Sequence, residues 1–129
     1  MIHSNAGESV DLFRGLNVMV VEDEAIVSFM IEDMLLDHGC AAVWHASNVG
    51  EALAMLGERQ PHVAVLDVNL GGELVFPVAQ KLEEAKIPFV FATGYGRNGI
   101  LHDWARHPII HKPYDGHTLA RALSALLSS

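Results

Sequence analysis

One cysteine, a shortage of basic residues and the lack of long apolar runs each exclude a class of protein for this chain. Cys40 is the single cysteine among 129 residues, which excludes an internal disulfide and any zinc or iron–sulfur site built from several cysteines. Lys and Arg number 8 against 16 Asp and Glu, and the resulting charge of −8 disfavours nucleic-acid binding, which needs basic side chains to displace counterions. No apolar run reaches membrane-spanning length, and the first residues lack the basic and then apolar order of a secretion signal. We therefore expect a cytoplasmic protein with no membrane or nucleic-acid partner.

What the chain does have is enough apolar material for one folded domain. Half of its residues are hydrophobic and 19% are charged, a balance that supports a packed core and argues against disorder. The first residues are mixed and polar without a sustained period, so we expect residues 1–16 to form a flexible leader. A regular pattern begins at Asn17, and we place one domain over residues 17–129.

Short apolar runs alternate with segments of helical periodicity along this domain. The runs predict buried strands and cover 18–21, 41–45, 62–66, 88–92 and 108–111. Apolar residues at helical spacing occur at 27–35, 49–56, from about 77, in a short segment at 100–106, and at 119–127. Asn48 and Glu51 have the spacing of a capping box at the start of the second helix. These alternations predict an α/β fold, a doubly wound five-stranded parallel sheet with helices on both faces.

Polar residues of complementary chemistry follow four of the predicted strands, at the edge where such sheets bind ligands. They are Glu22 and Asp23 after the first strand, Asp67 after the third, Thr93 after the fourth and Lys112 after the fifth. Clustered carboxylates repel one another unless a cation joins them, and Mg²⁺ favours such oxygen ligands. An ammonium and a hydroxyl opposite them would suit an incoming phosphoryl group. The residues therefore predict a Mg²⁺-assisted phosphoryl site with a carboxylate nucleophile.

In their order along the chain, these motifs resemble a receiver domain of two-component signalling. The acidic pair at 22–23, Asp67 within Val-Leu-Asp-Val-Asn at 65–69, Thr93 within Phe-Ala-Thr-Gly at 91–94, and Lys112-Pro113 carry the resemblance. It extends from about residue 17 to the C-terminus. The resemblance implies a flavodoxin-like sheet with the strand order 2-1-3-4-5.

The resemblance also implies a metal site. Asp23 and Asp67 would hold Mg²⁺ directly, Glu22 would act largely through water, and the backbone carbonyl of Asn69 would complete the protein ligands. Three carboxylates and the ammonium of Lys112 leave a charge of −2, which one Mg²⁺ offsets.

Phosphoryl chemistry follows from the same resemblance. Asp67 would be the phosphoacceptor and would attack a phosphohistidine of a partner histidine kinase. Thr93 would hydrogen-bond a phosphoryl oxygen, Lys112 would pair with the phosphoryl group, and the Lys112–Pro113 peptide bond is expected to be cis.

Two features depart from the common receiver pattern. Ile109 stands three positions before the lysine, where receivers usually have an aromatic switch residue, so the usual aromatic relay is in doubt. Tyr95 and Tyr114 are the candidate substitutes, although packing or loop roles explain both more simply. The stretch 91–96 reads Phe-Ala-Thr-Gly-Tyr-Gly and is similar to the signature of an alphaproteobacterial receiver subfamily, in which Gly96 would be tyrosine. Those receivers commonly stand alone and are associated with histidine kinases of the HWE class.

We therefore expect a stand-alone response regulator that signals by protein contact and catalyses only its own phosphorylation and dephosphorylation. One alternative is a Mg²⁺-dependent phosphohydrolase with an aspartyl nucleophile, but such enzymes of the haloacid dehalogenase type want a second acid two positions after the nucleophile. Asn69 occupies that position here. The other alternative is a degenerate receiver that binds partners without phosphorylation, which Ile109 would favour and the intact site residues would not.

Overall fold

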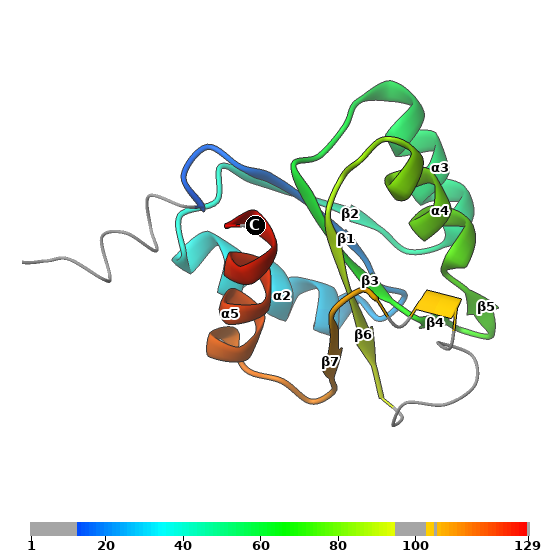
Figure 1. Ribbon diagram of the computed structural model, residues 1–129. Coiled ribbons are helices and arrows are strands. Elements are labelled where there is room, and N and C mark those ends of the chain that lie inside the picture. The colour runs from blue at the N-terminus through cyan, green and yellow to red at the C-terminus, as the bar shows by residue number, and fades with distance from the viewer. Residues whose placement is uncertain (1–12, 95–102, 105, 129) are drawn as a thin grey trace, which may run out of the picture.

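The computed structural model describes residues 13–94, 103–104 and 106–128. Its centre is a five-stranded sheet in the order β2-β1-β3-β6-β7, and every pairing in that sheet is parallel (Figure 1). The predicted fold class and strand order are therefore confirmed.

The three inner strands are buried along nearly their whole length. They are β1 (Asn17–Val21), β3 (Val63–Asp67) and β6 (Phe89–Thr93). Their continuous apolar runs are typical of parallel strands that are covered on both faces. The outer strands, β2 (Ala42–Ala46) and β7 (Ile109–His111), are more exposed.

Helices cover the two faces of the sheet in pairs, as Figure 1 shows. On one face lie α3 (Val49–Glu58) and α4 (Phe76–Glu84), and their core includes Met19 and Val21 of β1. On the other face lie α2 (Ala25–Asp37) and α5 (Gly116–Leu127), whose core includes Val18 and Val20. Successive residues of β1 thus point to opposite layers, as strand geometry requires. Among the described residues, no helix is both long and apolar enough to cross a membrane.

The predicted capping box of α3 is half correct. The Asn48 side chain accepts a hydrogen bond from the backbone N–H of Glu51 at 2.8 Å, as an N-cap residue does. The Glu51 carboxylate does not return to Asn48, because it accepts from the backbone N–H of Ser47 at 2.8 Å and from the Ser47 hydroxyl at 2.9 Å. The Glu51 carboxylate thus stabilises the start of α3 through Ser47, one residue before the Asn48 that the spacing predicts.

Phe13, inside the stretch that we assigned to the leader, is buried to 1% exposure. Its ring packs in the core under α2 and α5 and meets the ring of His38 edge-on at 5.7 Å. A single aromatic residue creates no period, so the sequence pattern does not reveal this contact. The packed structure thus includes Phe13, and residues 1–12 lie outside the described residues.

A two-stranded hairpin between β3 and α4 was not predicted. Its strands β4 (Asn69–Leu70) and β5 (Glu73–Leu74) have two residues each and are antiparallel, so they are too short to show a period. Gly71 and Gly72, which form the expected loop, take the two turn positions with φ of 65° and 101°. Positive φ at both positions is typical of a two-residue hairpin turn and favours glycine.

The segment after β6 is described only in part. The short helix expected at 100–106 includes residues outside the described ones, and the described Asp103 and Trp104 are in 3₁₀ conformation. Tyr95 and Gly96, on which the subfamily resemblance partly depends, also lie outside the described residues.

Candidate functional site

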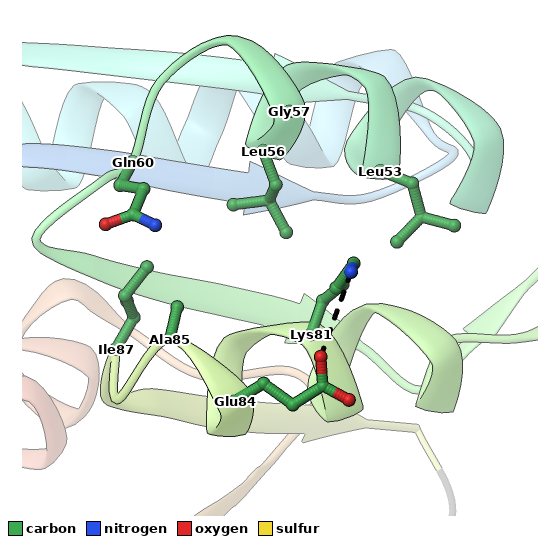
Figure 2. A pocket seen from close by; sticks show the side chains of 8 residues that line it. All are labelled: Leu53, Leu56, Gly57, Gln60, Lys81, Glu84, Ala85 and Ile87. Carbon is green, nitrogen blue, oxygen red and sulfur yellow. Dashed lines mark ion pairs between the residues drawn. The ribbon is translucent and has the colours of Figure 1, made fainter.

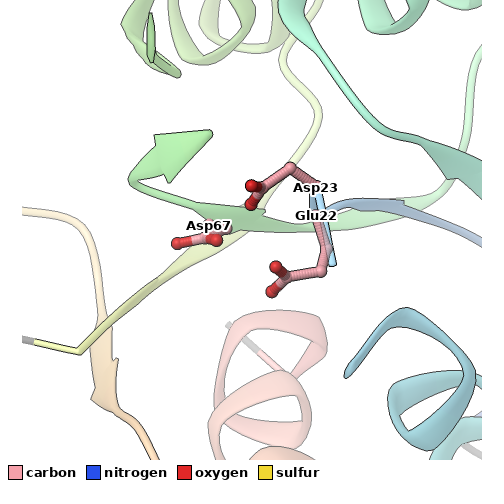
Figure 3. Close-up of side chains that lie close together, drawn as sticks. All are labelled: Glu22, Asp23 and Asp67. Carbon is pink, nitrogen blue, oxygen red and sulfur yellow. The ribbon is translucent and has the colours of Figure 1, made fainter. Parts of the chain in front are cut away.

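Three carboxylates meet at the carboxyl ends of two neighbouring strands, and Figure 3 shows them gathered there. Glu22 and Asp23 directly follow β1, while Asp67 is the last residue of β3. Each residue offers an oxygen that lies within 4.8 Å of the others. Glu22 and Asp67 are buried to 3% and 6% exposure, and Asp23 is exposed. The predicted acidic cluster is therefore present, with two of its members inside the protein and one facing solvent.

Lys112 balances the buried part of this cluster. Its Nζ donates to Glu22 Oε1 at 3.0 Å and to Asp67 Oδ2 at 3.1 Å. Desolvation alone would lower the pKa of the Lys112 ammonium, but its hydrogen bonds and attraction to the two carboxylates prevail and raise that pKa. Burial raises the pKa of Glu22, helped by the nearby charge of Asp67 and opposed by the hydrogen bond from Lys112. The ammonium therefore stays charged and offsets part of the repulsion between the carboxylates.

Both oxygens of Asp67 are held in place. Oδ2 accepts from Lys112, and Oδ1 accepts a long hydrogen bond of 3.4 Å from the backbone N–H of Asn69. The β4–β5 hairpin that begins at Asn69 thus starts beside the Asp67 carboxylate.

The carboxylates open into a cleft of about 470 Å³. It is lined by Asp23, Glu24, Asp67, Asn69, Gly71, Gly72, Thr93, Gly94 and Lys112. Thr93 ends β6 and is buried, and its backbone carbonyl accepts from the backbone N–H of Lys112 at 2.8 Å. The Lys112–Pro113 peptide bond is cis, as predicted. The structure therefore brings the predicted site residues together; Glu22 does not line this cleft and is joined to it through Lys112.

The donor set of this cleft fits a magnesium ion. Mg²⁺ takes six oxygen ligands at about 2.1 Å, so ligand oxygens on opposite sides of the ion lie about 4.2 Å apart. The carboxylate oxygens of Glu22, Asp23 and Asp67 lie within a comparable span of 4.8 Å. Asp23 reaches the open cleft, where water ligands can complete the shell. The cluster is thus consistent with a Mg²⁺ site.

Ile109, at the position where receivers usually have an aromatic switch residue, is half-buried. It lies on β7 and packs with the core of the α3–α4 layer. Tyr114 packs with the opposite core, under α2 and α5. Burial raises the pKa of Tyr114 strongly, and the negative charges of Glu22 and Asp67 add to that effect. Tyr114 is therefore a packing residue, as the simpler expectation has it, and its pKa also responds to the charges of the site.

A polar cluster beside the cleft was missed by sequence reasoning. The Ser28 hydroxyl is hydrogen-bonded to His45 Nδ1, and His45 Nε2 lies 3.1 Å from Glu32 Oε1. Ser28 and Glu32 are one turn apart on α2, while His45 lies on β2. The spacing of the helical pair is a weak signal, and nothing in the sequence pairs it with a strand residue. The cluster ties α2 to the edge strand of the sheet.

A second hollow lies away from the carboxylates. It has a volume of about 310 Å³ and runs between α3 and α4, where Figure 2 shows Leu53 and Leu56 facing the side of α4. Gln60 and Ile87, which border it, precede β3 and β6 and so mark the amino ends of those strands. This hollow is therefore separate from the acidic cleft at the carboxyl ends.

Comparison with known proteins agrees with this geometry. The sequence model of one protein family, the response regulator receiver domain, matches residues 18–124 of this chain. The sensory transduction protein LytT of Bacillus subtilis is 27% identical over 84% of this chain and 46% of its own length. Protein PilH of Pseudomonas aeruginosa is 24% identical over 86% of this chain and 97% of its own. The chain thus spans about half the length of that LytT but nearly all of PilH.

Solved structures give the same result. The solution structure of SdrG from Sphingomonas melonis Fr1 is 38% identical over 88% of this chain and 97% of its own, with a TM-score of 0.69. The receiver domain of the response regulator PhyR from Erythrobacter litoralis is 23% identical over 89% of this chain and 92% of its own, with a TM-score of 0.74, and shares the fold. The matched family model covers more than half of the chain and includes all three carboxylates and Lys112. The chain belongs to the response regulator receiver domain family.

Proposed function

We propose that this protein is a response regulator that accepts a phosphoryl group on Asp67 from a histidine kinase, in a Mg²⁺-dependent reaction, and signals by protein contact. One observation carries the proposal. The Asp67 carboxylate lines an open cleft together with an ammonium at 3.1 Å and within 4.8 Å of two further carboxylates. This combination supports the proposal, because a nucleophile, a cation for the phosphoryl group and a metal site would then share one cleft.

The transfer is a substitution at phosphorus. An oxygen of Asp67 attacks the phosphorus atom of a phosphohistidine, and the phosphorus–nitrogen bond breaks as the phosphorus–oxygen bond forms. The electron pair of the broken bond stays on the imidazole, which takes up a proton from solvent. The product is an acyl phosphate on Asp67, and no other reactant is needed.

Residues around Asp67 would serve that transfer without reacting themselves. Lys112 already donates to Asp67 Oδ2 and would donate to a phosphoryl oxygen once Asp67 is phosphorylated. Thr93 borders the same cleft and would hydrogen-bond another phosphoryl oxygen. A Mg²⁺ ion held by Asp23, Asp67 and the carbonyl of Asn69, with Glu22 acting largely through water, would neutralise charge on the incoming group.

The hydrolase alternative is not favoured. A haloacid dehalogenase type of enzyme wants an acid at the position of Asn69, where this chain has an amide. The Asn69 side chain is also engaged, because its Oδ1 accepts from the backbone N–H of Gly72 at 2.6 Å and closes the hairpin. An amide cannot act as a general acid, so a second hydrolytic step has no proton donor at this position.

The partner class is a histidine kinase, and the similarity of the stretch 91–96 to the alphaproteobacterial signature makes the HWE class our first choice. A panel of phosphorylated kinases, with HWE and other classes represented, tests this choice. Fastest transfer from an HWE kinase is expected, and faster transfer from another class would contradict it.

Labelled phosphoryl transfer tests the proposed acceptor. The wild type should be labelled by a phosphorylated histidine kinase or by acetyl phosphate with Mg²⁺, and Asp67→Asn should not be labelled. Asp33→Asn makes the same chemical change at an exposed position of α2 and should be labelled like the wild type. Unchanged labelling of Asp67→Asn would reject Asp67 as the acceptor. Absence of labelling in the wild type, with Mg²⁺ bound, would favour a degenerate receiver, and steady phosphate release from small phosphoesters would favour the hydrolase.

A further inference from the structure

The hydroxyl of Tyr114 is buried and has no hydrogen-bond partner in the part of the chain that the structure describes. Buried polar groups are nearly always paired, so an unpaired hydroxyl calls for an explanation. Phenylalanine at this position would fill the same space without that penalty. The hydroxyl therefore has no evident use in the arrangement seen here.

Strand geometry places Tyr114 on the same side of the sheet as Glu22. The backbone N–H of Glu22 donates to the carbonyl of Ala46 at 3.0 Å, so strand geometry continues one residue beyond β1. Because side chains alternate, Glu22 points to the same layer as Val20. Val20 belongs to the core against which Tyr114 packs. Both side chains therefore lie on the α2–α5 side of the sheet.

The charges of the site point to a use for the hydroxyl. Glu22 is 3% exposed, and its Oε1 accepts from Lys112. The same ammonium must turn toward the phosphoryl group when Asp67 is phosphorylated. Its departure would leave a buried carboxylate oxygen without a donor, which is costly in a protein interior.

We infer that Tyr114 is a positioning residue whose hydroxyl donates to Glu22 once Lys112 has turned to the phosphorylated Asp67. The inference rests on the proposed function. The exchange replaces one donor by another, so Glu22 remains paired in both states and Lys112 is released for the phosphoryl group. Burial and the two carboxylates raise the pKa of Tyr114, and the phenol therefore keeps the proton that it must donate.

The exchange would also transmit the effect of phosphorylation from the site to α5. Tyr114 directly precedes Asp115, the N-cap residue of α5, whose side chain accepts from the backbone N–H of Thr118 at 2.8 Å. A movement of the Tyr114 ring toward Glu22 would therefore act on the start of α5. This route does not need an aromatic residue at the position of Ile109.

The first test measures binding of the phosphoryl mimic beryllofluoride in the presence of Mg²⁺. Tyr114→Phe removes the hydroxyl alone and should weaken beryllofluoride binding about tenfold or more, the effect of losing a hydrogen bond to a charged group. The thermal midpoint without beryllofluoride should be unchanged or higher, since the variant removes an unpaired group. In the Glu22→Gln background, Tyr114→Phe should change binding less than about twofold, because the charged acceptor is gone. Equal affinity of Tyr114→Phe and the wild type would overturn the inference.

The second test observes the hydroxyl itself. The chain has 2 tyrosines, Tyr95 and Tyr114, so a protein with ¹³Cζ-labelled tyrosine gives signals that Tyr114→Phe assigns by loss of one. The Tyr114 signal should shift when beryllofluoride and Mg²⁺ are added, as a donated hydrogen bond forms. An unmoved Tyr114 signal in protein that binds beryllofluoride would reject the exchange. Failure of the wild type to accept phosphate from any donor would instead reject the proposed function, so the two failures are distinguishable.

Discussion

The backbone of Gly71 lies against the carboxylate of Asp23, although Gly71 is in the turn between β4 and β5 and Asp23 follows β1. A Cβ atom added to Gly71 would lie 3.3 Å from Asp23 Oδ2, closer than side chains normally approach. Gly71 also has φ of 65°, which a residue with a side chain adopts at a cost. The hairpin turn between β4 and β5 thus forms one wall of the acidic cleft, and its glycine leaves room for the carboxylate.

Gly71→Ala should weaken Mg²⁺ binding as well as the fold. The new methyl group meets Asp23 and must displace its carboxylate from the position that it holds beside Glu22 and Asp67. We expect a loss of about 1 kcal/mol in the free energy of unfolding from the positive φ, and a severalfold weaker Mg²⁺ affinity by isothermal titration calorimetry.

Gly72→Ala is the matched control. Gly72 has φ of 101°, and an added Cβ would meet nothing within 4 Å. It should lose at least as much stability, because φ of 101° lies further from the left-handed region open to alanine, but it should keep the Mg²⁺ affinity of the wild type. Equal Mg²⁺ affinity of the two alanine variants would mean that the contact between Gly71 and Asp23 does not shape the site.

Parallel topology explains why so much of the site could be predicted. A buried run such as Val63–Asp67 shows both the strand and the point where it ends, and neighbouring parallel strands end at the same edge. The sequence therefore predicts that the residues after these runs lie close together, and the prediction does not require knowing how the intervening helices pack. These residues are Glu22, Asp23 and Lys112. The bridge that Lys112 makes between Glu22 and Asp67 spans 90 residues of sequence and follows from that shared edge.

Contacts between residues that form no periodic pattern could not be predicted from the sequence. The β4–β5 hairpin consists of two-residue strands, and the pairing of Ser28 with His45 joins a helix to a strand through side chains alone. The Tyr114 hydroxyl is similar, because its burial depends on how the ring packs against the core under α2 and α5. Such features depend on tertiary packing, which leaves little trace in the spacing of residues.

Phe13→Ala should destabilise the domain strongly, although residue 13 lies in the stretch first assigned to a leader. The ring is 1% exposed and packs in the core under α2 and α5, so its removal leaves a cavity. We expect a loss of about 3–5 kcal/mol in the free energy of unfolding, measured by urea denaturation. Phe29→Ala makes the same change on α2 at a side chain that is 62% exposed, and it should cost about 0.5 kcal/mol or less. Similar losses in the two variants would contradict the role of Phe13 in the core.

Glu83 should make a pH-dependent contribution to stability. Its carboxylate accepts from His107 Nε2 at 2.6 Å and is also paired with Arg106. The hydrogen bond from His107 lowers the pKa of Glu83 below its ordinary value of 4.5, desolvation opposes this, and the Arg106 guanidinium lowers the pKa further. A lowered pKa in the folded state means stability that is present above pH 4.5 and is lost as the pH falls through the lowered pKa.

Glu83→Gln should therefore be less stable than the wild type at neutral pH, and the difference should shrink as the pH falls below 4.5. Urea denaturation at a series of pH values measures this difference. Glu84→Gln is the control, since Glu84 is 60% exposed and lies 3.8 Å from Lys81, and its small effect should vary little with pH. A Glu83→Gln difference that stays constant from neutral to acid pH would contradict the assignment.

Lys112→Gln should bind Mg²⁺ more tightly while losing phosphoryl transfer. In the wild type the ammonium lies 3.0 Å from Glu22 and 3.1 Å from Asp67, where it competes with a cation for the same carboxylates. Removing one positive charge at this distance should raise the Mg²⁺ affinity on the order of tenfold. Without Mg²⁺ the free energy of unfolding should fall by about 1–3 kcal/mol, because the buried Glu22 loses the charged donor to Oε1 and keeps only the backbone N–H of Glu24, which donates to Oε2.

Added Mg²⁺ should restore part of that stability in Lys112→Gln, since a bound cation that stabilises the folded state alone shifts the unfolding equilibrium. Calorimetric titration with Mg²⁺ and urea denaturation with and without Mg²⁺ measure both effects. Lys81→Gln removes the same charge from the exposed surface of α4 and should change neither quantity by more than about 0.5 kcal/mol. Equal Mg²⁺ affinity of Lys112→Gln and the wild type would mean that the ammonium and the metal do not compete for the same carboxylates. The proposed turn of Lys112 from the carboxylates to the phosphoryl group would then lack electrostatic support.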